Sequence, residues 1–480
     1  MSQPNIIVVV LDSLRQDHVG TYGGNQGLTP SIDAFAAEPQ VTVFDRAFPE
    51  ALPTVPARMG LLTGQRSLTT RPWGPIPDEQ MTLPERLRHD GYVTAMVTDN
   101  YHLHKPSMNY HKGFDSVQWI RGQEADPYRT APASVDLDPY MKPEMEGSLN
   151  ERLLEQYLRN TAKRNDEDEQ EFFAAQVFRE AIKWIERNGK HHPKFLLVDS
   201  FDPHEPWDPP AEYRGKHCDE TYDGPDLIDP MYGETDWMTE AELSHAKGRY
   251  AEEITFVDNW FGKFIEALKT NGVYEETLIT VVSDHGVQFG EHGKIGKPQD
   301  GLYREVVDIP MLVKLPSNLS INTPDRVDTP VQTHDLPATI LDSCGLERET
   351  DALHSRSLLP ILRGETTQVR DVAVTGYYND RCRVVRDDRW SFHRNVKDGT
   401  NSLFNLQNDP HEECNVINKH PDVAQRLESA IVASLNGPKS GPMSADSVPT
   451  IQERYRNRKS SETDVPTVVS RRLRELGYID

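Results

Sequence analysis

Carboxylate and imidazole side chains closely follow two apolar runs of this chain. Asp12 follows the run 6–11, and Asp284 with His285 comes just after the run 278–282. Carboxylates suit Ca²⁺, Mg²⁺ and Mn²⁺, and an imidazole adds affinity for Mn²⁺ or Zn²⁺. An Asp after a strand is more often a helix cap or a turn residue, so other groups must support such a site. The three residues are a candidate site for one divalent metal ion.

A threonine and an arginine lie one helical turn apart further along the chain. Pro56 suits the first turn of a helix over 57–63, which Gly64 would end. Thr54 then lies at a helix N-terminus, where backbone N–H groups and the helix dipole favour an anion. Arg58 can point back to the same end and hold an ester oxyanion with two N–H groups. The pattern indicates a nucleophile beside an anion site, although an ordinary helix cap at Thr54 explains this segment alone at least as well.

Apolar strands and amphipathic helices alternate along the chain and must position these residues. Such alternation predicts an α/β fold with a mainly parallel sheet covered on both faces, whose ligands bind beyond the carboxyl ends of the strands. The expected parallel strands are 6–11, 93–97, 195–198, 278–282 and 311–313, and the expected helices include 168–187 and 249–270.

The domain organisation follows from changes in composition. We expect a catalytic domain over 1–364 and a small C-terminal α+β subdomain over 365–435, in which short antiparallel strands are followed by a helix. The Pro-, Ser- and charge-rich stretch 436–480 is expected to be an extended tail with a terminal helix. The charged segment 122–168 reads as a long surface insertion, and we expect loops of this kind to select the leaving group.

The composition of the whole chain excludes several classes of function. Among its 480 residues, 52 are Lys or Arg and 76 are Asp or Glu, a net charge of −24. Such a surface repels nucleic acid, although a local cationic pocket still admits a small anionic ester substrate. No apolar run approaches the ~20 residues of a membrane span, and no basic residue precedes the first run. We expect four free thiols, a cytoplasmic location and no membrane partner, while a homo-oligomer remains open.

Several segments in one order resemble the sulfatase family of the alkaline phosphatase superfamily. The segment 52–58, Leu-Pro-Thr-Val-Pro-Ala-Arg, resembles that family's nucleophile motif, Cys-or-Ser-x-Pro-x-Arg, with Thr54 in the nucleophile position. The phrases Ile-Val-Val-Val-Leu-Asp-Ser-Leu-Arg from Ile7 and Ser-Asp-His-Gly-Val-Gln-Phe-Gly-Glu-His-Gly-Lys from Ser283 support the resemblance. It implies an alkaline phosphatase-like sandwich with a small C-terminal α+β subdomain.

The resemblance also implies roles for individual residues. Thr54 would both coordinate the metal ion and attack the ester, and Arg58 and Lys297 would hold the oxygens of the transferred group. His204 matches a position that contacts the ester, and His204 or His102 could protonate the leaving group. The positions implied for metal ligation are Asp12, Thr54, Asp284 and His285, and those implied for catalysis are Thr54, Arg58, Asn100, His102, His204 and Lys297.

Several positions depart from the usual sulfatase pattern. Ser13 stands where many sulfatases carry a second Asp, neutral Asn100 replaces a lysine, and His285 stands where many have Asn. The last departure resembles the phosphonate monoester and phosphodiester hydrolases of the superfamily. A threonine is not expected to become the formylglycine of sulfatases, so we expect no formylglycine here. Thr nucleophiles do occur in other phosphoester-processing branches of the superfamily.

These features favour a metal-dependent hydrolase of phosphate or phosphonate esters that uses Thr54. A phosphothreonine can be hydrolysed by water, whereas a sulfated threonine lacks the aldehyde route by which formylglycine releases sulfate. One alternative is a sulfatase, such as one that acts on a glycan, that uses Thr54 directly or carries an engineered nucleophile. Another is a non-catalytic anion-binding pseudo-sulfatase, against which the intact Asp12, Arg58 and Lys297 positions argue. The ion would be Mn²⁺, Ca²⁺, Zn²⁺ or Mg²⁺.

Overall fold

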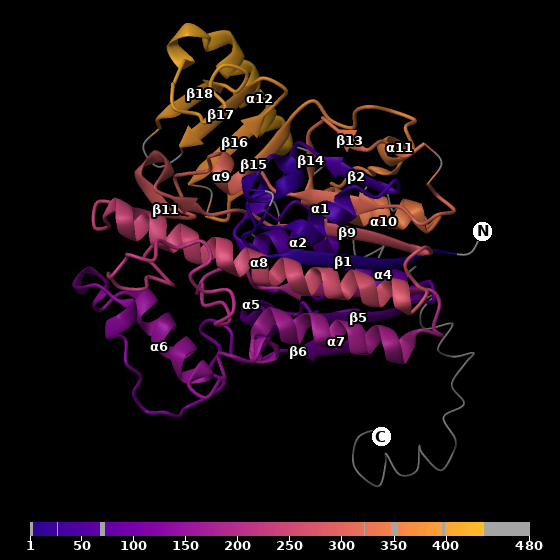
Figure 1. The fold of residues 1–480 in the computed structure, drawn as a ribbon. Helices are drawn as coiled ribbons and strands as arrows, with labels where there is room; N and C mark the ends of the chain where they lie inside the picture. Colours follow the sequence, from indigo (N-terminus) through magenta and orange to yellow (C-terminus); the bar gives the residue numbers. More distant parts are fainter. Residues whose placement is uncertain are drawn as a thin grey trace, which may run out of the picture. The chain divides into compact units, whose positions relative to one another are not determined.

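The computed structural model describes residues 3–25, 27–67, 73–320, 322–346, 354–379, 381–395 and 399–435. Met1–Leu435 forms one compact unit; the second, Asn436–Asp480, lies outside the described residues, as do the expected tail and its terminal helix. An eight-stranded sheet forms the centre of the first unit (Figure 1). Its strands, in spatial order, are β13 (Arg326–Val327), β2 (Val41–Phe44), β12 (Met311–Lys314), β9 (Thr277–Val282), β1 (Asn5–Leu11), β7 (Lys194–Ser200), β5 (Val93–Thr98) and β6 (Ser116–Trp119).

Four of the five expected strands pair in parallel as predicted. β9, β1, β7, β5 and β6 form one parallel block. The strand expected at 311–313 forms, but its predicted direction is wrong, because β12 runs antiparallel to both β9 and β2. The register pairs Met311, the first residue of β12, with Val282, the last of β9. The chain between them therefore stays at one edge of the sheet and returns without crossing it, which reverses the direction of β12.

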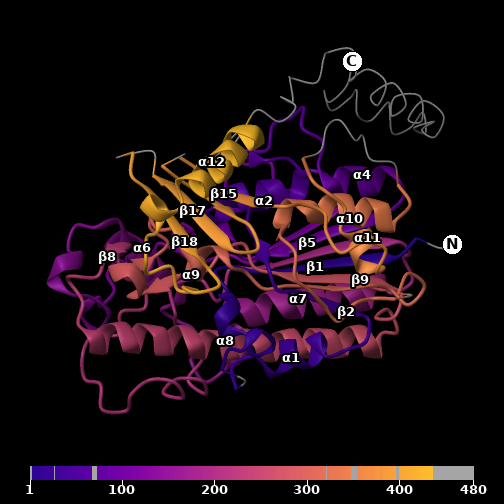
Figure 2. The ribbon, with the colours of Figure 1, turned by 90° about the horizontal axis from the view of Figure 1, so that it is seen from above.

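Helices cover both faces of the sheet, as the alternation predicted (Figure 2). Successive side chains of a strand point to opposite faces, so Ile7 and Val9 of β1 join one core and Ile6 and Val8 join the other. The first core includes α1 (Pro30–Ala36), α7 (Phe173–Asn188) and α8 (Glu240–Thr270), and the second includes α2 (Thr54–Thr63), α4 (Leu83–His89) and α10 (Leu336–Ser343).

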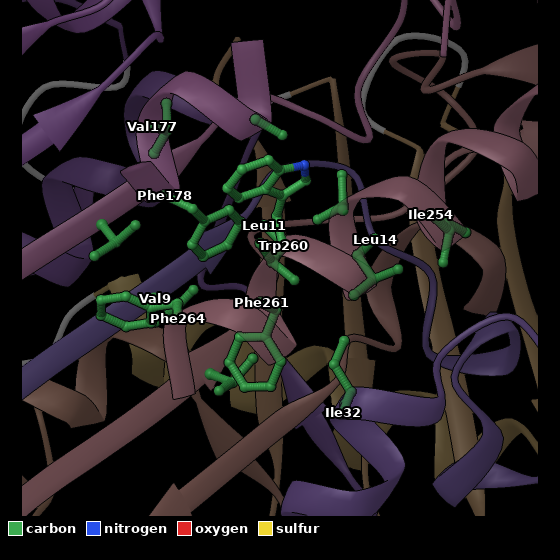
Figure 3. Close-up of a cluster of buried hydrophobic side chains, with 14 of the residues drawn as sticks. Val9, Leu11, Leu14, Ile32, Val177, Phe178, Ile254, Trp260, Phe261 and Phe264 are labelled. Carbon is green, nitrogen blue, oxygen red and sulfur yellow. The ribbon is translucent and has the colours of Figure 1, made fainter. Parts of the chain in front are cut away.

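The two predicted long helices form at α7 and α8. Aromatic residues at helical spacing on α8, including Phe261 and Phe264, pack with Phe178 of α7 against β1 (Figure 3). Helix α8 begins nine residues before the predicted start, at Glu240, because Thr239 and Glu242 form a capping box there. This packing holds the carboxyl end of β1 in place.

A second sheet lies in the C-terminal part of the described chain. Its order is β18 (Asn401–Asn405), β17 (Trp390–Asn395), β16 (Cys382–Arg386), β15 (Ala373–Tyr377) and β4 (Ala51–Leu52), and α12 (Pro421–Leu435) packs against it. The sheet includes β4, which lies just before Thr54, so the element that leads into the proposed nucleophile is part of the C-terminal sheet. The boundary at residue 364 stays a prediction.

Smaller elements complete the unit. They are β3 (Ala47–Phe48), β8 (Gly233–Glu234), β10 (Gln288–Phe289), β11 (Lys294–Gly296), β14 (Val331–Gln332), α5 (Tyr101–His104), α6 (Leu149–Thr161), α9 (Arg304–Val307) and α11 (Leu359–Leu362), with short 3₁₀ turns between them. The four cysteines are free thiols. Among the described helices, none is both long enough and apolar enough to cross a membrane.

Candidate active site

Three parallel strands bring carboxylates together at one edge of the central sheet. Asp12 follows β1, Asp284 closely follows β9, and Asp199 lies near the end of β7. β1 pairs with both β7 and β9, so their carboxyl ends are adjacent. One ligand atom each from Asp12, Asp284 and His285 lies within 4.8 Å of the others, and all three residues are buried. The cluster predicted from sequence therefore forms.

The chemistry of this cluster fits a divalent cation. The Nε2 atom of His285 is buried without a hydrogen-bond partner, and Oδ2 of Asp284 accepts no hydrogen bond but forms an ion pair with Nη1 of Arg58 at 2.5 Å. Burial and the neighbouring Asp284 carboxylate raise the pKa of Asp12 well above its usual value. Burial lowers the pKa of His285 to about 4, so its imidazole is neutral and can act as a ligand. A cation bound here would compensate part of the buried negative charge and would accept the lone pair of His285 Nε2.

The orientation of His285 supports the same interpretation. Its Nδ1 lies 3.1 Å from the carbonyl oxygen of Gly286, so an N–H at Nδ1 can donate to that oxygen. The lone pair then belongs to Nε2, which lies 3.6 Å from Oδ1 of Asp12 and 3.5 Å from Oδ2 of Asp284. Such a backbone contact sets the tautomer in many metal-binding histidines.

Arg58 lies inside the carboxylate cluster. Its guanidinium is 1% exposed and contacts Asp12 at 3.1 Å, Asp199 at 2.8 Å and Asp284 at 2.5 Å. Burial alone would lower the pKa of Arg58, but the three carboxylates outweigh it and raise that pKa. Its predicted role of holding ester oxygens stays a prediction, and in this structure the side chain holds the carboxylates in place.

Thr54 is the first residue of α2, and its position rules out the helix-cap interpretation. Pro53 occupies the cap position, and no side chain caps the helix. Thr54 is 3% exposed, and α2 ends at Gly64 as predicted, with a left-handed φ of 68°. Strand β4 pairs with β15 through Leu52 and Tyr377, so the chain leading into Thr54 is held by a sheet.

Lys297 joins the site from a loop after β11. Its Nζ lies 2.8 Å from Nε2 of His204, 2.9 Å from Oε1 of Glu205 and 3.5 Å from Oγ of Ser13. Ser13 in turn lies 3.3 Å from Nδ1 of His285. The predicted residues Lys297 and His204 are therefore in contact, and Ser13 connects them to the metal-type cluster.

His204 has both ring nitrogens occupied. Its Nδ1 lies 2.6 Å from the carbonyl oxygen of Glu205, to which an N–H can donate, and Nε2 then accepts from Lys297. Burial, followed by the Lys297 charge, holds the pKa of His204 well below its usual value. His204 is therefore a neutral acceptor and orients Lys297.

His102 and Asn100 lie on α5 and before it. Nε2 of His102 lies 2.8 Å from Oε2 of Glu124, and Nδ1 lies 3.3 Å from Nζ of Lys105. Burial would raise the pKa of Glu124, but His102 outweighs burial and lowers it to about 2. The side chain of Asn100 caps α5 by accepting from the backbone N–H of His102 at 3.1 Å. Asn100 thus positions His102; its predicted catalytic role stays a prediction.

Sequence reasoning missed three carboxylates of this region: Asp199, Glu124 and Glu205. Asp199 follows the apolar run 195–198, so a search for carboxylates after apolar strands, which identified Asp12, could also have found Asp199. In the structure Asp199 pairs with Arg58. Glu205 is next to His204 in sequence. No sequence pattern could have identified Glu124, because it lies in an irregular segment and its contact with His102 depends on the tertiary fold.

Comparisons with known proteins identify the family that this chain resembles. The sulfatase family model matches residues 4–346, and the model of the C-terminal part of N-sulphoglucosamine sulphohydrolase matches residues 290–436. An arylsulfatase from Clostridium perfringens is 25% identical and covers 92% of this chain and 96% of its own. A multifunctional alkaline phosphatase superfamily protein from Trinickia caryophylli is 25% identical over 75% of this chain and 77% of its own.

Solved structures also resemble the fold of this chain. The crystal structure of a phosphonate monoester hydrolase from Agrobacterium radiobacter superposes with a TM-score of 0.70 at 21% identity, covering 91% of this chain and 96% of the other. The chain belongs to the sulfatase family of the alkaline phosphatase superfamily. It is a hydrolase of that family, and both sulfatases and phosphonate monoester hydrolases share its fold.

Proposed function

We propose that this protein hydrolyses phosphate or phosphonate esters with Thr54 as its nucleophile. The observation that carries the proposal is the position of Thr54, a buried threonine at the start of α2 without a capping role. A helix N-terminus stabilises the anionic group that such a nucleophile attacks. Water can hydrolyse a phosphothreonine, whereas a sulfated threonine lacks the aldehyde route of formylglycine. Phosphorus esters therefore suit this nucleophile best.

In the proposed first step, the hydroxyl oxygen of Thr54 forms a bond to phosphorus, the bond from phosphorus to the leaving oxygen breaks, and the hydroxyl proton passes to water. Lys297 and Arg58 stabilise charge on the non-bridging oxygens. A divalent cation held by Asp12, Asp284 and His285, and by Thr54, would supply positive charge that favours the alkoxide form of Thr54. In the second step, the oxygen of a water molecule forms a bond to phosphorus, the bond from phosphorus to the Thr54 oxygen breaks, and a proton from that water passes to the Thr54 oxygen. The phosphate or phosphonate product leaves, and the hydroxyl of Thr54 is restored.

His102 is the proposed proton donor to the leaving group. Oε2 of Glu124 lies 2.8 Å from its Nε2 and orients the ring, whereas His204 already uses both nitrogens as a neutral acceptor. Trp73, which is 41% exposed, lies against His102 with ring centroids 5.7 Å apart. We propose that Trp73 contacts the leaving group.

The test compares aryl phosphate monoesters, phosphodiesters, phosphonates and sulfates, each with Mn²⁺, Zn²⁺, Ca²⁺ and Mg²⁺. Turnover should be fastest with a phosphorus ester. Thr54→Val removes the hydroxyl at nearly constant shape and should abolish turnover, while Thr54→Ser should retain it. Mass spectrometry of acid-quenched wild type should detect a phosphorylated peptide that contains Thr54. Full activity of Thr54→Val, or faster turnover of sulfates, contradicts the proposal.

His102→Asn tests the proton donor separately. The loss of kcat should be on the order of 10²-fold for an alkyl ester, whose leaving group needs a proton. It should be much smaller for p-nitrophenyl phosphate, whose leaving group is stable as an anion. Equal losses on both substrates would assign His102 a positioning role.

Sulfate-ester hydrolysis is the second candidate, because relatives with sulfatase names dominate the matches, including the one from Clostridium perfringens. The same ester panel decides between the candidates. If Thr54 attacks a sulfate ester, a sulfated Thr54 peptide should accumulate, because the aldehyde route is absent. A protein that turns over no ester yet binds sulfate or phosphate would instead match the pseudo-sulfatase alternative.

A further inference from the structure

A cavity of about 470 Å³ lies away from Thr54 and the carboxylate cluster, beside the edge strand β6. Its walls come from β6, the segment after it, α6 and the start of α7. None of the predicted site residues lines it. Part of its lining belongs to the inserted segment 122–168, namely Tyr128, Arg129, Asn160, Thr161, Lys163 and Arg164.

Uncompensated positive charge gathers in this cavity. Arg129, Lys163 and Arg179 line it, and within the described parts of the chain none of the three pairs with a carboxylate. Of the two acidic lining residues, Glu180 pairs with Lys183 at 2.6 Å, whereas Glu171 accepts only a backbone N–H, that of Asn165 at 2.9 Å, and keeps its negative charge. The three cations therefore outnumber the one carboxylate that is not paired with a cation. The cavity is thus cationic in a protein of net charge −24, which favours an anion at this place.

Two exposed aromatic rings flank these cations. Trp119, at the end of β6, is 41% exposed, and its ring stacks on His104 at 5.5 Å. Tyr128 is 47% exposed. The amides of Gln118 and Gln170 also line the cavity and can bond to hydroxyl groups. Aromatic surface beside amides and cations suits a hydroxylated ring that carries an acidic group.

We propose that this cavity binds an anionic sugar, with its acidic group on Arg129, Lys163 and Arg179 and its ring against Trp119. The inference does not depend on the reaction at Thr54. The ligand is either a remote unit of a longer substrate or a separate small molecule, since the chemistry of the cavity is the same for both. His104 on α5 stacks on Trp119, and His102 on the same helix pairs with Glu124, so α5 contacts one lining residue of the cavity and carries the proposed proton donor.

The probe is glucuronate, which carries the acid and the ring but no ester to hydrolyse. Calorimetric titration of the full chain should show saturable binding of glucuronate and no saturable binding of neutral glucose. The double variant Arg129→Gln/Lys163→Gln should weaken glucuronate binding about tenfold or more, because two charge-assisted contacts are lost. Trp119→Ala should weaken glucuronate binding but leave binding of inorganic phosphate unchanged.

The matched control is Arg152→Gln/Lys190→Gln, which removes the same charge from two exposed positions outside the cavity. It should bind glucuronate like the wild type, and thermal unfolding should show that both double variants are folded. No saturable binding by the wild type, equal loss in the control, or equal binding of glucose would overturn the proposal.

An activity assay on a small aryl ester distinguishes the two sources of the ligand. If glucuronate changes the wild-type rate and not that of Arg129→Gln/Lys163→Gln, the ligand is a separate molecule. If the rate is unchanged in both while glucuronate still binds, the cavity holds a remote unit of a longer substrate. Both results agree with binding of glucuronate in the cavity.

Discussion

Arg58 balances three buried carboxylates, so its removal should matter more than the loss of an ordinary ion pair. In metal-free protein, Arg58→Ala should lower the free energy of unfolding by about 3–5 kcal/mol, because Asp12, Asp199 and Asp284 lose their shared cation. Urea denaturation measures the change. A divalent ion should narrow the difference between variant and wild type, since it restores positive charge to the cluster.

Arg88 provides the control for this prediction. It lies 3.4 Å from Asp115, and both side chains are largely exposed. Arg88→Ala should change the free energy of unfolding by less than about 1 kcal/mol, as expected of a surface ion pair. If Arg58→Ala costs no more than Arg88→Ala, the carboxylates do not depend on Arg58.

Glu305, beneath the loop that follows His285, makes stability depend on pH. Burial raises its pKa from 4.5 to about 7, and its Oε2 has no hydrogen-bond partner. Below pH 4.5 the Glu305 carboxyl is neutral in both the folded and the unfolded protein, so its ionisation does not affect the free energy of unfolding. As pH rises from 4.5 through about 7, the unfolded chain loses this proton before the folded protein does, so stability falls.

Glu305→Gln should remove this pH dependence. At pH 8 the variant should be more stable than wild type by on the order of 2–3 kcal/mol, and at pH 4 the two should be equal. Unfolding free energies over this pH range measure the effect. Glu266→Gln, at an exposed position on α8, should change neither value. Equal stability of Glu305→Gln and wild type at pH 8 would show that the ionised Glu305 carboxylate does not destabilise the folded protein.

At the scale of single elements, α2 depends on how it ends. Gly64 has a φ of 68°, and its N–H donates to the carbonyl oxygen of Gly60 at 2.8 Å. Gly64→Ala forces a side chain into this left-handed conformation and should cost about 1 kcal/mol of stability. The N–H groups of His354 and Ser355 donate to the carbonyl oxygen of Gly64, so the turn cannot relax freely.

Gly189 at the end of α7 is the matched control, because its φ is −53° and a Cβ there would meet only ordinary contacts. Gly189→Ala should be neutral or slightly stabilising. Thermal unfolding of both variants measures the contrast. If both substitutions change the thermal stability equally, the left-handed conformation at Gly64 does not require a glycine.

Strand β4 connects the chain just before Thr54 to the C-terminal sheet. Only two residues, Ala51 and Leu52, pair with β15, yet they directly precede the segment that starts α2. A two-residue strand has too weak a pattern to be recognised in a sequence. The direction of β12 was mispredicted for a similar reason, since an apolar run has the same pattern in either direction.

At the scale of the whole molecule, the net charge of −24 opposes the approach of an anionic substrate. Salt screens this repulsion, so kcat/KM should rise between low and physiological ionic strength. The rise should be larger for a dianionic phosphate monoester than for a monoanionic diester, which serves as the control. Stopped or continuous assays over a series of sodium chloride concentrations measure kcat/KM for the monoester and for the diester. A fall in kcat/KM with salt would mean that local positive charge governs association.

The family, four of the parallel strands, the helices that cover them, and the meeting of Asp12, Asp284 and His285 could all be predicted from the amino-acid sequence. This was possible because hydrophobic periodicity and strand-end carboxylates are local patterns, and parallel strands end at one edge. Only the tertiary structure decided that Arg58 is shared by three carboxylates, that Lys297 pairs with His204, that Glu124 contacts His102, and that β4 joins the C-terminal sheet. These contacts join residues far apart in the sequence, and no local pattern encodes which distant side chain will lie within a few ångströms.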